Sequence, residues 1–444
     1  MLKKAFVDKI GAYPKVTVVN VILVANALIW YFYAFSFLME VAEGVGLSNS
    51  ETLVVWGTKF LGVAIAALFG SFFIYRLKRR LTFLRYWMLA GVILSLTPIA
   101  FDITELPVFT LFLLLVGVYF GLGVPVCLGY FAATTEARNR SRLGGITFLS
   151  VFVGFFLLST MATSDITLNS GILAACKAIG LVFLLLLKPE EKQIGQSGHV
   201  SFVSVIKSRP FLLYFVPWGM FSIVNSLAFT IVGKFFPSDF FHSSIIVENV
   251  LSGIFAIVFG FLGDYIGRKR LTVTGFALLG LGYASLGLLP GNIYAWCLYT
   301  AVDGIAWGCF FTIFLITIWG DLAQGKSSEK YYAIGSMPYL VSNFLRISIG
   351  TYIGEVPQSA VFSFASVFLF LAVLPLMYAP ETLPEKTIRE RELKSYIEKA
   401  QKEAEKTQNT RTKDEQREKE NDDLEIEVIP EDFEEKLKEA EQYY

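Results

Sequence analysis

The sequence predicts an all-α membrane protein with twelve transmembrane helices, arranged as two pseudo-symmetric six-helix bundles. Three observations support this prediction. The 444 residues are 54% hydrophobic with a mean hydropathy of +0.56, which is too apolar for a soluble chain of this length. Basic residues gather in alternate connections between apolar runs, and two sequence patterns recur at almost the same spacing.

Twelve apolar runs have the length of a membrane span. A helix needs about twenty mostly apolar residues to cross the hydrocarbon core of a bilayer. The first run is too long for a signal-peptide core and lacks a small-residue cleavage site, so we expect it to remain as the first helix. The predicted spans are 16–38, 52–75, 83–101, 108–132, 143–163, 170–187, 211–235, 244–266, 271–289, 293–320, 333–353 and 358–378.

The distribution of charge predicts the orientation. If the N-terminus is inside, the inner connections contain 20 Lys and Arg residues and the outer connections contain none. Cytoplasmic loops of membrane proteins are enriched in these residues. A missing or additional span would place later loops on the other side and destroy this separation. The pattern therefore predicts a multi-pass protein of the cell membrane with both termini in the cytoplasm.

The two halves of the chain repeat. A shift of 190 residues aligns 70–82 with 260–272 and matches a glycine, a tyrosine, a basic triplet and Leu-Thr. A shift of 187 residues aligns the Gly-x-x-x-Gly of 117–121 with that of 304–308. Two similar shifts indicate duplication, which in membrane proteins marks two half-bundles that move about a central site.

Four segments follow from the spans and the repeat. After the last span the chain becomes highly charged, with an amphipathic helix expected over about 385–406, a polar stretch, and a short helix after Pro430. This tail either docks a protein partner or is only solvated. The predicted segments are an N-terminal half at 1–187, a cytoplasmic linker at 188–210, a C-terminal half at 211–384 and a cytoplasmic tail at 385–444.

A short basic turn separates the eighth and ninth predicted spans. It reads Gly260-Phe-Leu-Gly-Asp264-Tyr-Ile-Gly267-Arg268-Lys269-Arg270. Glycines let helices approach closely, and a carboxylate at a helix end can bind a neighbouring helix N-terminus or an arginine. In the first-half copy, Ile74 and Leu77 stand in place of Asp264 and Gly267.

This turn resembles the signature loop of the major facilitator superfamily, and Pro380-Glu381-Thr382 resembles the exit motif of its sugar-porter branch. The resemblance covers the membrane part, residues 1–384. It implies the twelve-helix fold of secondary transporters and alternating access by movement of the two halves. It also implies a gating role for Gly260, Asp264, Gly267, Arg268, Lys269 and Arg270.

Ionisable residues inside predicted spans are costly and therefore indicate function. Asp303 and Arg346 lie near the middle of their spans. They could form a static ion pair, or Asp303 could take up a proton. Glu248 and Lys59 lie nearer the outer surface. They could form an outer gate or a second proton site. Alternatively, Glu248 faces water and Lys59 snorkels to the membrane surface. Lys177 is expected to snorkel.

The resemblance implies that the first, fourth, seventh and tenth spans line the central cavity. Amide groups and aromatic rings on these spans would suit a small polar or amphipathic solute. The predicted substrate-binding residues are Asn26, Trp30, Tyr31, Tyr119, Trp218, Asn225 and Trp307.

Other function classes lack their motifs. There is no phosphate-binding loop for direct drive by ATP. The two histidines, His199 and His242, lie in loops, so we expect no metal site, catalytic residue or cofactor. The predicted function is a secondary transporter of a small organic solute, by proton-coupled symport. Its expected partners are the lipid bilayer, the solute and protons, with no nucleic acid. The alternatives are a proton-driven efflux antiporter and a non-transporting receptor of the same fold.

Overall fold

The computed structural model describes most of the membrane part and little of the tail. It covers residues 14–77, 79–189, 200–235, 238–349 and 357–384, and in the tail residues 389, 393, 396–397 and 399–405. The chain divides into two compact units, residues 1–384 and 385–444. The described tail positions are helical, within the range predicted for an amphipathic helix. The polar stretch and the helix predicted after Pro430 lie outside the described residues.

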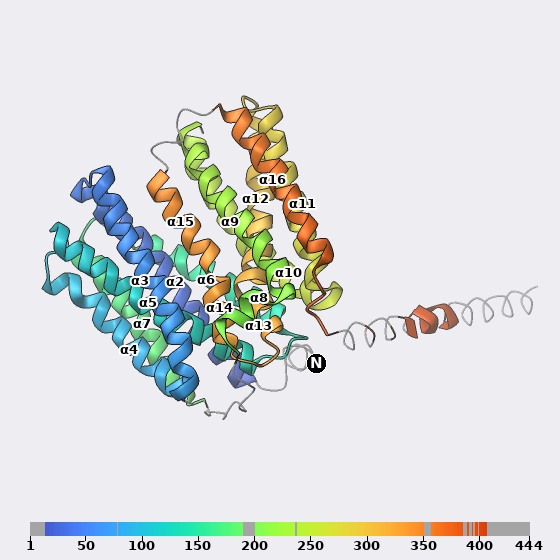
Figure 1. Cartoon of the computed structure of the whole chain (residues 1–444), viewed down its shortest axis with the longest axis horizontal. Coiled ribbons are helices and arrows are strands. Elements are labelled where there is room, and N and C mark those ends of the chain that lie inside the picture. The colour runs from blue at the N-terminus through green and yellow to red at the C-terminus, as the bar shows by residue number, and fades with distance from the viewer. Residues whose placement is uncertain are drawn as a thin grey trace, which may run out of the picture. The chain divides into compact units, whose positions relative to one another are not determined.

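All regular structure in the described residues is helical, as Figure 1 shows. The elements are α2 (Pro14–Val45), α3 (Asn49–Leu77), α4 (Arg80–Ala100), α5 (Leu106–Thr134), α6 (Arg140–Ser159), α7 (Ile166–Leu187), α8 (Phe202–Lys207), α9 (Arg209–Phe235), α10 (Ser238–Ile266), α11 (Arg268–Leu288), α12 (Ile293–Phe310), the π-helix η1 (Phe311–Thr317), α13 (Ile318–Ala323), α14 (Ser328–Gly335), α15 (Met337–Ile349) and α16 (Gln358–Tyr378).

The described part contains eleven helical runs that are long and apolar enough to cross a membrane. Only helices satisfy all their backbone groups internally in lipid, which explains why the apolar runs fold this way. The predicted eleventh span, 333–353, differs: α14 ends at Gly335 and α15 begins at Met337. The last residues of that predicted span lie outside the described ranges. The predicted all-α membrane fold is confirmed.

The tenth predicted span contains an irregularity. Helices α12 and α13 are joined without a break by the π-helical segment Phe311–Thr317. The Thr317 hydroxyl donates a hydrogen bond to the Thr312 carbonyl (2.8 Å), which gives this carbonyl a partner within the widened turn. Such segments are rare and often occur at functional sites.

Close packing at glycines confirms the duplication. In each half, a Gly-x-x-x-Gly helix lies directly on the backbone of a neighbouring helix, α5 on α3 and α12 on α10. A Cβ atom added at these glycines would lie 2.3–2.8 Å from a carbonyl oxygen, so only glycine allows this approach. The contacts are Gly117 with Lys59, Gly121 with Val63, Gly304 with Glu248, and Gly308 with Ser252.

The two halves meet along matching helices. Figure 1 shows α2–α7 grouped beside α9–α16. Helix α6 packs on α10, and α3 packs on α15. Helices α4, α6 and α11 begin at Arg80, Arg140 and Arg268. At one end of the bundle, Arg140 and Arg268 share the carboxylate of Asp321, and Arg80 pairs with Glu329. We call this end the basic end.

Candidate functional site

The signature loop binds the first turn of a helix from the other half. Asp264, near the end of α10, accepts hydrogen bonds from the backbone N–H groups of Ser141 (3.2 Å) and Arg142 (3.0 Å). These groups begin helix α6, where the helix dipole favours negative charge. The guanidinium of Arg268 lies 3.0 Å from the same carboxylate. Asp264 therefore joins the two halves at the basic end.

A second carboxylate, Asp321 of α13, binds arginines from both halves. Arg140 of the first half forms an ion pair with one of its oxygens, and the Nε of Arg268 lies 3.2 Å from the other. The Thr382 hydroxyl donates a hydrogen bond to Asp321 (3.1 Å). We call Asp264, Arg268, Arg140 and Asp321 the closure network. Its side chains are buried, so each charge depends on its partners.

Two of the predicted gating glycines shape the backbone. A Cβ atom at Gly260 would lie 2.8 Å from the Ser141 carbonyl, so glycine lets α10 approach α6. Gly267 has a φ of +100°, a conformation that favours glycine, at the start of α11. Arg270 is exposed.

The exit motif anchors the same loop. Glu381 accepts hydrogen bonds from the backbone N–H groups of Arg268 (2.9 Å) and Lys269 (3.1 Å) and so caps the start of α11. The Lys269 ammonium donates to the Met377 carbonyl (2.7 Å). Tyr214 of α9 donates to the Pro380 carbonyl (2.7 Å). The segment after the last span thus holds the signature loop in place.

The first half forms its own, smaller link across the basic end. Arg80, at the start of α4, lies 2.5 Å from the carboxylate of Glu329 in the first turn of α14. The Glu329 side chain rests against Gly129, where a Cβ atom would lie 2.5 Å from its Cγ. Ile74, at the position equivalent to Asp264, is buried and apolar. An ion pair therefore replaces the capping carboxylate in this half.

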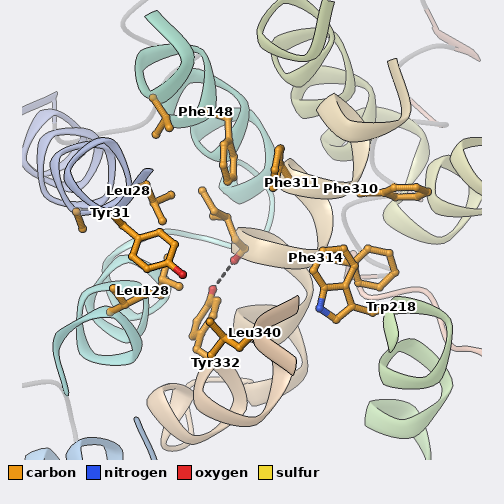
Figure 2. Close-up of a cluster of buried hydrophobic side chains, with 14 of the residues drawn as sticks. Leu28, Tyr31, Leu128, Phe148, Trp218, Phe310, Phe311, Phe314, Tyr332 and Leu340 are labelled. Atoms are coloured by element: carbon orange, nitrogen blue, oxygen red, sulfur yellow. Dashed lines mark hydrogen bonds between the residues drawn. The ribbon is translucent and has the colours of Figure 1, made fainter. Parts of the chain in front are cut away.

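A small, partly open central cavity of about 60 Å³ lies between the halves. Helices α2, α3 and α5 line one side, and η1, α14 and α15 line the other. Its walls are almost wholly apolar, although Tyr31, Ser336 and Tyr339 are among its lining residues. Figure 2 shows Leu28 and Tyr31 from the first half meeting side chains of the second.

Of the seven predicted substrate-binding residues, Tyr31 lines this cavity. Its ring stacks on Phe120 at a centroid distance of 3.8 Å. Trp218 and Trp307 lie one layer behind, with ring centroids 6.2 and 6.3 Å from that of Tyr339. The structure therefore brings these three around one cavity.

The other four predicted substrate-binding residues make contacts within their own half. Asn26 donates to the Cys176 carbonyl (2.7 Å), and Trp30 donates to the Ser95 hydroxyl (2.8 Å). The Tyr119 ring stacks on Trp87 at 5.0 Å, and Asn225 accepts a hydrogen bond from Tyr283 (3.3 Å). None of the four is among the residues that line the cavity.

Two predicted coupling residues come together in the second half. Asp303 of α12 is buried, and its carboxyl group interacts with that of Glu248 of α10. Trp307 and Tyr299 are its other neighbours. Among the described residues, no Lys or Arg forms an ion pair with either carboxyl group of this acid pair. Trp307 connects it to Tyr339 and hence to the cavity.

The third predicted coupling residue lies elsewhere. Arg346 of α15 interacts electrostatically with Tyr339 and Tyr31. The ion pairs among the described residues do not include one between Arg346 and Asp303. Arg346 therefore interacts with two tyrosines that line the cavity.

Two lysines of the first half are fully buried. The Lys59 ammonium lies 4.3 Å from the ring centroid of Phe35 and 4.7 Å from that of Trp56. The Lys177 ammonium lies 4.6 Å from that of Trp87. The prediction that Lys177 snorkels to the membrane surface is therefore wrong. Lys59 is buried as well, so the alternative in which it snorkels is also wrong. Cation–π contacts with surrounding rings hold both ammonium groups inside the bundle.

Several functional residues were missed. Asp321 and Glu329 bind arginines of the other half, but the predicted orientation depends only on Lys and Arg and gives these two carboxylates no role. Acidic residues at the ends of predicted spans, on the same side as the basic loops, could have indicated these ion pairs. Tyr339 lines the cavity from α15, on a span that the resemblance did not assign to it.

Comparison with known proteins agrees with this architecture. The family model described as Major Facilitator Superfamily matches residues 243–413. No curated protein matches the sequence. The proton:xylose symporter XylE, bound to 6-bromo-6-deoxy-D-glucose, is similar with a TM-score of 0.62 at 18% identity, over 83% of this chain and 96% of that chain.

The human organic anion transporter MFSD10 (TETRAN) is similar with a TM-score of 0.59 at 16% identity, over 82% of this chain and 100% of that chain. At these identities the likeness shows a shared fold. Both structures are named as transporters. The predicted resemblance to the major facilitator superfamily is confirmed, by the family model in the second half and by the fold over most of the chain.

Proposed function

We propose that the protein is a proton-coupled secondary transporter that imports a small organic solute by alternating access. The observation that carries this proposal is the acid pair, Glu248 and Asp303, which interacts inside the second half and is connected to the central cavity through Trp307 and Tyr339. One similar structure is named a proton:xylose symporter, which agrees with this coupling.

The acid pair is suited to bind a proton. Two carboxyl groups this close repel each other when both are ionised, so one proton is shared between them. Trp307 contacts Asp303 and also packs near Tyr339, a lining residue of the cavity. A solute that displaces Tyr339 also shifts Trp307 and so changes the surroundings of Asp303. This changes the affinity of Asp303 for the proton.

The closure network supports alternating access. Arg140 and Asp321 come from different halves, and opening the basic end requires their separation. On the opposite side of the cavity, the Phe60 ring of α3 lies 5.8 Å from that of Phe344 of α15. One face is held by ion pairs and the other by aromatic contacts, so the two faces can open in turn around the cavity.

The experiment uses the purified full chain in proteoliposomes. A thermal-shift screen of sugars, carboxylates, amino acids and amphipathic drugs first identifies a solute that binds. Uptake of that solute is then measured with the outside acidic, and exchange of labelled for unlabelled solute is measured without a gradient. We expect Asp303→Asn to lose gradient-driven accumulation while it keeps exchange, since exchange needs no net proton movement.

Full gradient-driven accumulation in the Asp303→Asn, Glu248→Gln double variant would overturn the coupling role. Expulsion of solute driven by an inward proton gradient would favour the efflux antiporter instead. Binding without exchange in the wild-type protein would favour a receptor.

We also propose that the basic end faces the cytoplasm and that the protein lies in the cell membrane. Arg138 and Arg270 are exposed at loops predicted to be inside. Cysteines placed at these two positions in a background without the native cysteines should both resist an impermeant thiol reagent in intact cells. Labelling of one but not the other would contradict the topology.

A further inference from the structure

Lys59 is a buried cation beside the central cavity. It lies on α3 one turn from Val63 and two turns from Ala67, both of which line the cavity. Its ammonium is 5.5 Å from the ring centroid of Tyr31, another lining residue. Successive turns place these α3 residues on one face of the helix. Lys59 therefore continues the cavity wall.

The described residues provide Lys59 with no hydrogen-bond acceptor and no carboxylate partner. The side chain is 0% exposed. A buried charge without an ionic partner is strongly unfavourable, and ring contacts offset part of that cost. A leucine or methionine at this position would avoid that cost, and ionisable residues inside a membrane bundle typically mark functional positions.

A second basic residue interacts with Tyr31 from the other half. Arg346 interacts electrostatically with Tyr31 and Tyr339. It lies seven residues beyond Tyr339 on α15, which returns it to nearly the same helix face. Tyr31 therefore has a lysine of the first half and an arginine of the second as neighbours. The remaining lining residues are mainly apolar.

We propose that Lys59, with Arg346 opposite, forms an anion site, and that the transported solute is a small organic anion with one acidic group on an apolar body. This inference rests on the proposed function and names its substrate class. The acidic group binds Lys59 once the Tyr31 ring moves aside, and the apolar body fills the cavity against the aliphatic wall. Phe60 and Phe344 close over this site from the two halves.

The test measures binding of monocarboxylates and their neutral amides to the purified full chain in detergent. Benzoate, phenylacetate and hexanoate are paired with benzamide, phenylacetamide and hexanamide, and Kd is read from tryptophan fluorescence. We expect at least one acid to bind ten-fold more tightly than its amide. Lys59→Met should remove this preference, and Lys59→Arg should keep most of it.

Lys177→Met is the matched control. Lys177 is also buried among aromatic rings of the first half, but its neighbours Trp30, Trp87 and Tyr119 do not line the cavity. This variant should keep the preference for acids. Equal binding of acids and amides by the wild-type protein, absence of binding by every acid, or an unchanged preference in Lys59→Met would each overturn the anion site.

The two proposals fail in different experiments. One possible result is that acid binding depends on Lys59 while vesicles with Asp303→Asn still accumulate solute. That result would support the anion site and contradict proton coupling through the acid pair. If the protein takes up a neutral solute along the proton gradient and Lys59→Met does not change this uptake, the transporter proposal is supported and the anion site is contradicted.

Discussion

In the first half Gly117 packs on the carbonyl of Lys59, and in the second half Gly304 packs on the carbonyl of Glu248. These contacts are equivalent under the duplication, with residue shifts of 187 and 189. Yet the side chains at the two positions have opposite charge. The first half surrounds its lysine with aromatic rings, whereas the second half sets its glutamate against Asp303.

This difference shows that duplication preserved the backbone contacts at the glycines but not the charge of the side chains at the equivalent positions. The glycine-to-carbonyl contacts depend on backbone geometry, which tolerates little change at close-packed positions. Side-chain charge at the same depth is free to differ, because each half provides its own surroundings. We infer that the halves differ in role, with Lys59 of the first half as the main group that binds the charge of the solute and the acid pair of the second half binding the proton.

The basic end shows a similar asymmetry. The second half uses a capping carboxylate, Asp264, and adds the shared carboxylate Asp321. The first half has Ile74 at the capping position and relies on Arg80 and Glu329. The second half should therefore provide most of the stability of the closed basic end.

The largest effect is expected for Asp321→Asn. This change leaves Arg140 and Arg268 buried beside a neutral amide, and breaking a buried ion pair costs about 3–5 kcal/mol. The free energy of unfolding of the purified protein should fall by about that amount in a denaturant titration. The control is Glu136→Gln, whose ion pair with Arg138 is 62% exposed on both sides. This control should change stability very little, and equal effects of the two variants would contradict the ranking.

An intermediate effect is expected at the equivalent glycines. A Cβ at Gly117 would lie 2.3 Å from a carbonyl oxygen and one at Gly304 2.8 Å, and backbone oxygens cannot rotate away. Overpacking of this kind costs about 1–3 kcal/mol, so both alanine variants should be destabilised, Gly117→Ala more than Gly304→Ala. Gly171→Ala is the control, since no atom lies within 4 Å of its added Cβ. Stability loss in only one half would argue against equivalent packing.

The helical membrane fold could be predicted from the sequence, because bilayer thickness, charge asymmetry and glycine spacing each constrain the backbone strongly. Asp264 was found from its motif, and its hydrogen bonds to α6 follow the expected capping logic. Asp303 was expected to interact with Arg346, but its carboxyl group interacts with that of Glu248, because depth along a span does not give the direction of a side chain. Asn26 and Trp30 were assigned to the cavity for the same reason, although both face their own half.

The smallest effect is expected for the link formed by Arg80 and Glu329. Arg80 is 19% exposed, so water weakens this ion pair in comparison with the closure network. A double-mutant cycle of Arg80→Gln and Glu329→Gln should give a coupling of about 1 kcal/mol in the free energy of unfolding. Gly129→Ala provides a check, since its Cβ would displace the Glu329 side chain and should weaken the same pair without removing a charge. A coupling as large as the loss in Asp321→Asn would mean that both halves hold the basic end equally, and the proposed asymmetry would be wrong.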